Sequence, residues 1–176
     1  RGCPLLMLVV TPAICGTIIS RFGTEEQKQR WLPGICDGST IMSFAITEPD
    51  AGSNSHRITT TARRDGAEWV LSGQKVYISG IDSAEAVLVV SRTTDEKTGK
   101  LKPALFIVPT DAPGFTATRI PMDLHMADSQ FSLFLDDVHL PADALVGKED
   151  GALMQLFAGL NPEQTEAVET LEGPVL

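Results

Sequence analysis

A change in hydrophobic periodicity constrains the fold of this chain more than any other feature of its sequence. Up to Gly38 the apolar residues follow helical spacing, whereas after Gly38 they alternate with a period of two, which is typical of strands. The alternating segments are short, have no helical pattern between them and are separated by turn sequences such as Ser72-Gly73. This pattern predicts an antiparallel β-barrel or sandwich. The predicted strands are 41–46, 57–64, 68–71, 74–79, 86–92, 104–109, 115–120 and 130–135.

Helical segments flank this β region. Thr24-Glu25-Glu26-Gln27 has the form of a capping box and predicts a helix from Glu25 to about Ile35. The stretch 1–16 before it holds a basic residue, an apolar run and small residues; as a whole it is nearly long enough to span a bilayer and also resembles a secretory signal. Pro12 and Gly16 interrupt that run, so we favour a buried core helix. A last helix is predicted at 151–160, and the order of helices, strands and helix indicates an α+β fold.

Composition excludes several classes of function. The chain has 176 residues, is 43% hydrophobic and 21% charged, and can bury a substantial core as a soluble globular protein. Its net charge of -9 argues against a nucleic-acid-binding protein, which would present a basic face. The histidines are dispersed, which argues against a metal site. The sequence also lacks the Gly-x-Gly-x-x-Gly motif, which argues against a dinucleotide-binding fold. Cys3, Cys15 and Cys36 form no CxxC pair, which predicts reduced, buried thiols in a cytoplasmic protein.

Two predicted strand ends carry the strongest indication of a binding site. Residues 44–53 join a strand end, a proline and a turn of small residues, and residues 73–80 form a second strand that ends in a hydroxyl and a glycine. Such a place is typical of a backbone that meets a ligand. The alternative is a plain strand exit in which Ser53 and Asn54 satisfy turn amides, with Tyr77 as a half-buried packing residue.

A set of motifs resembles one family of flavoenzymes. They are residues 23–28 (GTEEQK), 46–53 (ITEPDAGS), 73–79 (GQKVYIS) and 135–141 (LDDVHLP). Their order and spacing are similar to those of acyl-CoA dehydrogenases, and the set is much more specific than any single motif. The resemblance implies that 1–38 end the family's N-terminal helical domain, that 39–145 form its middle β domain, and that 146–176 begin its C-terminal helical domain and end in a divergent tail.

The resemblance also implies an FAD site. By similarity, Ile46 and Thr47 would hydrogen-bond the pyrimidine edge of the flavin, and Ser53 would lie near the pyrophosphate and the CoA-bearing substrate. Tyr77 takes the place of a tryptophan against the ring, and Ser79 that of a threonine near flavin N5; both keep the aromatic face or the hydroxyl. The implied cofactor contacts are Phe44, Ile46, Thr47, Gly52, Ser53, Tyr77, Ile78 and Ser79.

The implied reaction is the oxidation of an acyl-CoA thioester to trans-2-enoyl-CoA, which needs a carboxylate base of raised pKa. In the isovaleryl-CoA and long-chain members this glutamate follows the pattern Leu-x-x-Glu-Arg. Residues 160–164 (LNPEQ) match it up to the last position. The resemblance therefore implies Glu163 as the base, with Asn161, Gln164 and Ser53 beside the substrate; a solvated acid in a charged tail is the alternative for Glu163.

The family passes its electrons to an electron-transfer flavoprotein and assembles as tetramers or dimers. The resemblance places roughly the first half of the N-terminal domain and nearly all of the C-terminal domain outside these 176 residues, so we expect the isolated chain not to catalyse the reaction. The alternatives are a non-catalytic flavin- or CoA-binding remnant or partner subunit, and a β domain that binds neither. Oxidation by molecular oxygen on the same fold also stays open.

Overall fold

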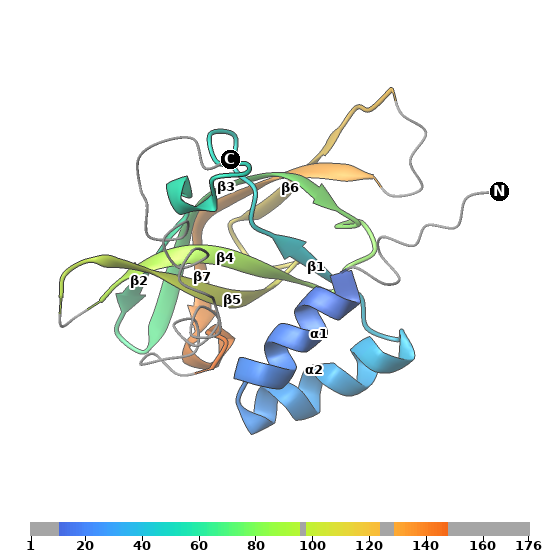
Figure 1. Ribbon diagram of the computed structural model, residues 1–176, viewed down its shortest axis with the longest axis horizontal. Coiled ribbons are helices and arrows are strands. Elements are labelled where there is room, and N and C mark those ends of the chain that lie inside the picture. Colours follow the sequence, from blue (N-terminus) through green and yellow to red (C-terminus); the bar gives the residue numbers. More distant parts are fainter. Residues whose placement is uncertain (1–10, 96–97, 124–128, 148–176) are drawn as a thin grey trace, which may run out of the picture.

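The computed structural model describes residues 11–95, 98–123 and 129–147, and every structural statement below concerns these residues (Figure 1). The chain begins with two helices and continues as strands of one sheet. The elements are α1 (Thr11–Phe22), α2 (Glu25–Asp37), β1 (Met42–Ala45), η2 (Ser55–Arg57), β2 (Thr61–Asp65), β3 (Glu68–Ser79), β4 (Ala86–Thr94), β5 (Leu101–Pro109), β6 (Phe115–Ile120), β7 (Gln130–Pro141) and η3 (Ala142–Ala144). The fold class predicted from the sequence is confirmed.

The helices begin and end where the local sequence predicts. Helix α2 starts with the expected capping box. The backbone amide of Gln27 donates to Thr24 Oγ1 at 3.2 Å, and the backbone amide of Thr24 donates to Gln27 Oε1 at 3.0 Å. It ends at Gly38, whose φ of 79° is favourable for glycine. Helix α1 confirms the predicted core helix over its described part, because it buries Cys15 and Ile19. The predicted helix 151–160 lies outside the described residues.

The strands form one mixed sheet in the order β1-β4-β2-β3-β7-β6, with β5 paired to β4. Most neighbours are antiparallel, as expected, but β1 and β2 both run parallel to β4. The alternation of apolar residues shows which side chains are buried, but it carries no information on strand direction. Residues 46–60 separate β1 from β2 without a hairpin, so both strands can join β4 in the same direction.

Two predicted boundaries are wrong for identifiable reasons. The predicted turn at Ser72-Gly73 is a bulge within the continuous strand β3, where the register against β7 shifts between Leu71 and Gly73. The predicted strand 57–64 begins only at Thr61, because the amides of Thr59 and Thr60 donate to a carboxylate and not to a neighbouring strand. Strand β7 also extends past its predicted end to Pro141.

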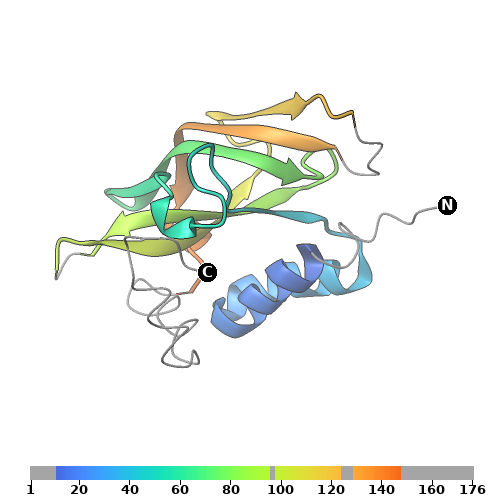
Figure 2. The same cartoon turned by 45° about the horizontal axis from the view of Figure 1, so that its top comes forward.

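The sheet curls so that β3, β7 and β6 lie over β4 and β5, and the helices form a further layer beneath (Figure 2). One hydrophobic cluster fills the inside of the curl, with Leu71, Val89, Phe106 and Leu133 among its members. A second cluster joins the helices to the outer face of β1, β4 and β5. The first cluster includes Ile78 of β3, and the second includes Ala51 and Ile58 of the loop after β1, so both segments are anchored in a core.

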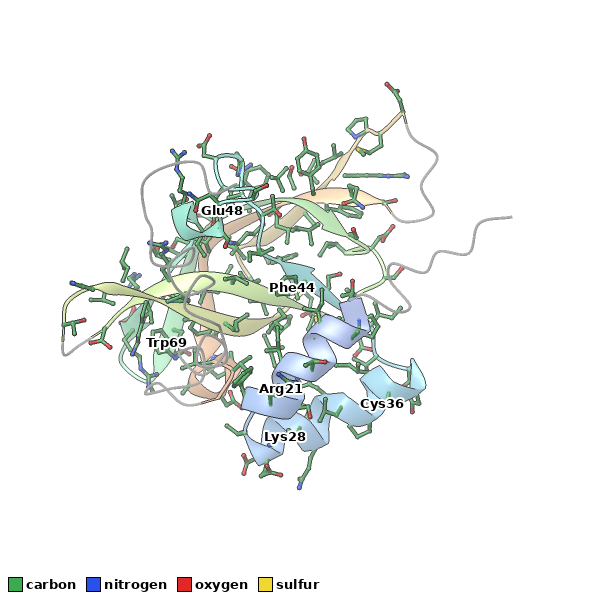
Figure 3. All side chains as sticks on the ribbon, in the orientation of Figure 1. Arg21, Lys28, Cys36, Phe44, Glu48 and Trp69 are labelled. Carbon is green, nitrogen blue, oxygen red and sulfur yellow. The ribbon has the colours of Figure 1, made fainter. Side chains whose placement is uncertain are left out.

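The described cysteines differ from each other. Cys15 is buried, as predicted, whereas the prediction was wrong for Cys36, which is exposed near the end of α2 (Figure 3). Both are free thiols. Within residues 11–95, 98–123 and 129–147, no helix is long and apolar enough to cross a membrane.

Candidate functional site

The two strand ends that the sequence singles out lie against each other. The Val76 amide donates to the Thr47 carbonyl at 3.0 Å, and Lys75 Nζ donates to the Ile46 carbonyl at 3.1 Å. Within β1, Ser43 Oγ donates to the Ser79 carbonyl at 2.8 Å. These contacts hold the chain that leaves β1 against the last residues of β3. Thr47 and residues 76–79 together form one surface, which we call the wall.

The loop that follows Thr47 is closed by a tight turn. Glu48 and Ala51 exchange backbone hydrogen bonds of 3.0 and 3.1 Å, with Pro49 and Asp50 at the tip. Gly52 and Ser53 follow and are exposed. A Cβ added at Gly52 would meet no atom within 4 Å, so the space beside this loop is open among the described residues.

Tyr77 has an unusual conformation at the end of β3. Its φ is +58°, in the left-handed region, at the bulge where the register against β7 shifts between Lys75 and Ile78. A bulky residue is rarely found there and costs roughly 1 kcal/mol or more. The side chain is nevertheless 60% exposed, so burial of the ring does not compensate for this cost. An exposed aromatic ring on a strained backbone is typical of a binding surface.

The Ser79 hydroxyl is prepared to donate a hydrogen bond. Gln130 Nε2 donates to Ser79 Oγ at 2.8 Å, so the serine oxygen already acts as an acceptor there. Its own proton has no acceptor among the residues that the structure describes. The Thr47 hydroxyl, which is partly exposed, also has no partner in that part of the chain. Two hydroxyl groups therefore have a proton for which the described residues offer no acceptor.

A buried ion pair lies directly behind the wall. Lys75 Nζ is 2.8 Å from Glu48 Oε1, and the side chains are 0% and 3% exposed. The Glu48 carboxylate also accepts from the amide and hydroxyl of Thr59 at 2.6 and 2.8 Å, and from those of Thr60 at 2.9 and 2.5 Å. Figure 3 places Glu48 beside η2. The pair thus connects the exit of β1, the start of β2 and the middle of β3.

Both charged groups of this pair have shifted pKa values. Burial on its own would raise the pKa of Glu48, but Lys75 and the threonine donors outweigh it and lower that pKa to about 2. Burial lowers the pKa of Lys75, and the Glu48 carboxylate acts against this shift. Glu48 is therefore a carboxylate at neutral pH, with every donor around it directed to its two oxygens.

The predicted cofactor contacts differ in their position and exposure in the structure. Thr47, Tyr77 and Ser79 come together on the wall, and Gly52 and Ser53 lie on the adjoining open loop. Ile78 is 2% exposed in the core, so only its backbone is available to a ligand. The side chains of Phe44 and Ile46 pack toward the helix-side core, and Figure 3 shows Phe44 over the helices. Asn161, Glu163 and Gln164 lie outside the described residues.

The sequence reasoning missed Glu48, Lys75 and Gln130. Glu48 and Lys75 both lie inside the motifs 46–53 and 73–79, in which only neighbouring residues are predicted to contact a ligand. A lysine in the middle of a predicted strand is a signal in itself, because an ammonium that becomes buried there needs a partner. Gln130 starts a strand whose predicted residues gave no sign of a contact with Ser79.

The site presents polar groups and one aromatic ring. Among residues 11–95, 98–123 and 129–147 no group of histidine, cysteine and acidic side chains could hold a metal ion. The wall offers hydroxyl donors, free loop backbone and one exposed aromatic ring. Such a set suits a flat heteroaromatic ligand that carries acceptor atoms and an anionic tail.

The comparisons with known proteins agree with this description. The sequence pattern of the acyl-CoA dehydrogenase middle domain matches residues 43–138, and that of the acyl-CoA dehydrogenase N-terminal domain matches residues 1–39. The acyl-CoA dehydrogenase FadE12 of Mycobacterium tuberculosis is 70% identical over 93% of this chain, which covers 42% of that protein. The short-chain specific mitochondrial enzyme of Bos taurus is 38% identical over 84% of this chain and 36% of its own length.

Solved structures show the same architecture. A glutaryl-CoA dehydrogenase from Mycobacterium smegmatis in complex with FADH2 superimposes with a TM-score of 0.74 at 40% identity, over 82% of this chain and 36% of that one. The butyryl-CoA dehydrogenase of Megasphaera elsdenii gives 0.74 at 29% identity, over 82% of this chain and 38% of its own. The chain thus spans about two fifths of the length of these relatives. It belongs to the acyl-CoA dehydrogenase family.

Proposed function

We propose that this chain forms the β-domain wall of an FAD site and that its parent enzyme oxidises an acyl-CoA thioester to trans-2-enoyl-CoA. One observation carries the proposal: the free hydroxyls of Thr47 and Ser79 and the exposed ring of Tyr77 lie on one wall, held together by the contact between Val76 and Thr47. The relative crystallised with FADH2 and the family membership support the same cofactor.

The residues on the wall fit the requirements of a flavin. The Ser79 hydroxyl, which accepts from Gln130, can donate its proton to a ring nitrogen, and the Thr47 hydroxyl can donate to the pyrimidine edge. Tyr77 offers an aromatic face that the strained backbone holds in the open. The exposed Gly52 and Ser53 can bring amides and a hydroxyl to the pyrophosphate.

The chemistry divides between the cofactor and the chain. FAD supplies the acceptor for the hydride that leaves the β-carbon of the acyl group. The protein must remove the proton from the α-carbon, so that one proton and one hydride leave and a trans double bond forms. We assign the proton to the carboxylate of Glu163, with Asn161, Gln164 and Ser53 beside the substrate. The substrate is an acyl-CoA, and the electrons go on to an electron-transfer flavoprotein in a cytoplasmic, homo-oligomeric parent enzyme.

A pair of serine and threonine variants tests the flavin wall. Ser79→Ala removes the donor beside Gln130, and the dissociation constant of FAD, measured by quenching of flavin fluorescence, should rise about tenfold for one lost hydrogen bond. Thr118→Ala is the matched control, because Thr118 is exposed on β6, which is separated from β3 by β7. Equal FAD affinity of Ser79→Ala and the unmodified chain would remove Ser79 from the site.

A separate experiment tests the base. In flavin-loaded protein that reduces a dye with acyl-CoA as the electron donor, Glu163→Gln should abolish turnover, because an amide cannot accept the α-proton. FAD affinity should stay unchanged in this variant. Undiminished turnover would exclude Glu163 from the mechanism. Flavin-loaded wild-type chain without any turnover would instead support the non-catalytic flavin-binding alternative.

A further inference from the structure

The buried ion pair is the strongest feature of the described chain that the proposed function does not yet use. Lys75 and Glu48 face no solvent, yet they lie next to the residues that form the wall. Lys75 also donates to the Ile46 carbonyl, one residue before Thr47, and the next residue on its own strand, Val76, donates to the Thr47 carbonyl. Glu48 is thus adjacent in sequence to the candidate flavin contact Thr47, and Lys75 lies two residues before the candidate contact Tyr77.

Stability alone does not account for this pair. Burial of two charges costs so much that well-packed apolar replacements of buried ion pairs are often equally stable or more stable. What a fully bonded pair does provide is a single geometry, because each donor has one position in which it satisfies the carboxylate. Here the carboxylate accepts from Lys75 and from the amides and hydroxyls of Thr59 and Thr60. Three separate chain segments are thereby fixed to one point.

We propose that the Glu48–Lys75 pair is the positioning device of the flavin wall, which sets the spacing between Thr47 and the Tyr77–Ser79 strand end. This inference rests on the proposed function, since the wall is the one that we assign to FAD. Neither residue touches the ligand; each acts through its neighbour, Glu48 through Thr47 and Lys75 through Val76 and Tyr77. The strained backbone of Tyr77 lies two residues after Lys75, where a fixed anchor can hold it.

The test separates positioning from stability. Lys75→Met leaves the Glu48 carboxylate buried without its counter-charge and should lower the melting temperature strongly. The double variant Glu48→Gln/Lys75→Met carries no buried charge and should recover most of that loss. Lys28→Met is the matched control, because it removes the same charge from the exposed 2.8 Å pair with Glu25 on α2. It should change neither the melting temperature nor the wall.

The decisive readout needs no flavin. Hydrogen exchange of the Val76 amide, which donates to Thr47, should be at least tenfold faster in the double variant than in the unmodified chain. The Val146 amide, which donates to Leu105, serves as the internal control and should keep its protection. Equal protection of Val76 in the double variant and the unmodified chain would overturn the inference.

FAD titration of the same proteins supplies a second, independent readout. The dissociation constant of FAD should rise at least tenfold in the double variant despite its restored melting temperature, and the visible absorption bands of the bound flavin should shift. Unchanged affinity and spectrum in the double variant would overturn the positioning role. If Val76 exchange responds as expected but the unmodified chain binds no FAD, the pair still positions the wall and the proposed flavin function fails.

Discussion

Gln27 links the helices to the β domain, and its replacement has a calculable effect. The side chain is 5% exposed. Its Nε2 donates to the carbonyls of Asp143 and Leu145 at 2.7 and 2.8 Å, and its Oε1 accepts from the amides of Thr24 and Gly147 at 3.0 and 3.2 Å. All hydrogen-bonding positions of the amide group are thus used, and three of its partners, Asp143, Leu145 and Gly147, lie beyond β7 at the far end of the described chain.

Gln27→Met keeps the size of the side chain but removes these hydrogen bonds, and no large cavity forms. Each hydrogen bond contributes roughly 1 kcal/mol net, and water can reach some of the freed partners, so we expect a loss of about 3 kcal/mol in the free energy of unfolding. For a chain of this size the melting temperature should fall by roughly 10 °C.

Urea unfolding followed by circular dichroism measures the loss, with Gln29→Met as the control. Gln29 lies on the same helix but is exposed, so its change should stay within about 0.5 kcal/mol. If the two variants lose the same stability, Gln27 does not hold the helices to the β domain, and the reasoning from its contacts is refuted.

Two further predictions concern the residues behind the wall. The pKa of Glu48 is lowered from 4.5 to about 2, so its stabilising contribution of about 3 kcal/mol is complete above pH 4.5 and disappears as the pH falls toward 2. Urea unfolding at several pH values should show this fall in the free energy of unfolding of the unmodified chain. An equal dependence on pH in Glu48→Gln would contradict the prediction. Gly73→Ala should lower the free energy of unfolding by about 3 kcal/mol, because its Cβ would lie 2.5 Å from Thr60 Oγ1 at a φ of +154°. The Cβ of Gly52→Ala would meet no described atom within 4 Å, so this variant should be nearly neutral in thermal unfolding. A similar loss of stability in both variants would contradict this prediction.

The sequence predicts those features that depend on neighbouring residues. The capping box of α2, the strands β4 to β6 and the approach of the two strand ends follow from local spacing and from motifs. Strand direction does not, because β1 and β2 run parallel to β4 across a connection that side-chain alternation does not describe. The bulge at Gly73 was read as a turn because glycine suits both.

The partners of buried polar groups are the second kind of feature that the sequence leaves open. Glu48 and Lys75 are separated by 27 positions, and Ser79 and Gln130 by 51, so no local pattern pairs them. Tyr77 was identified as an aromatic residue of the site, but its left-handed backbone follows from the bulge and not from its neighbours. The candidate site residues can thus be picked out one by one from the sequence, whereas the contacts between them are found only in the structure.

The central claim is that this chain carries a flavin-binding wall, and a direct measurement of FAD binding tests it. The purified chain is titrated with FAD, followed by flavin fluorescence and by thermal unfolding. The account predicts saturable quenching, a yellow protein that releases FAD on heating, and a melting temperature that rises with FAD concentration. A colourless protein whose fluorescence titration shows no saturation and whose melting temperature ignores FAD would contradict the account.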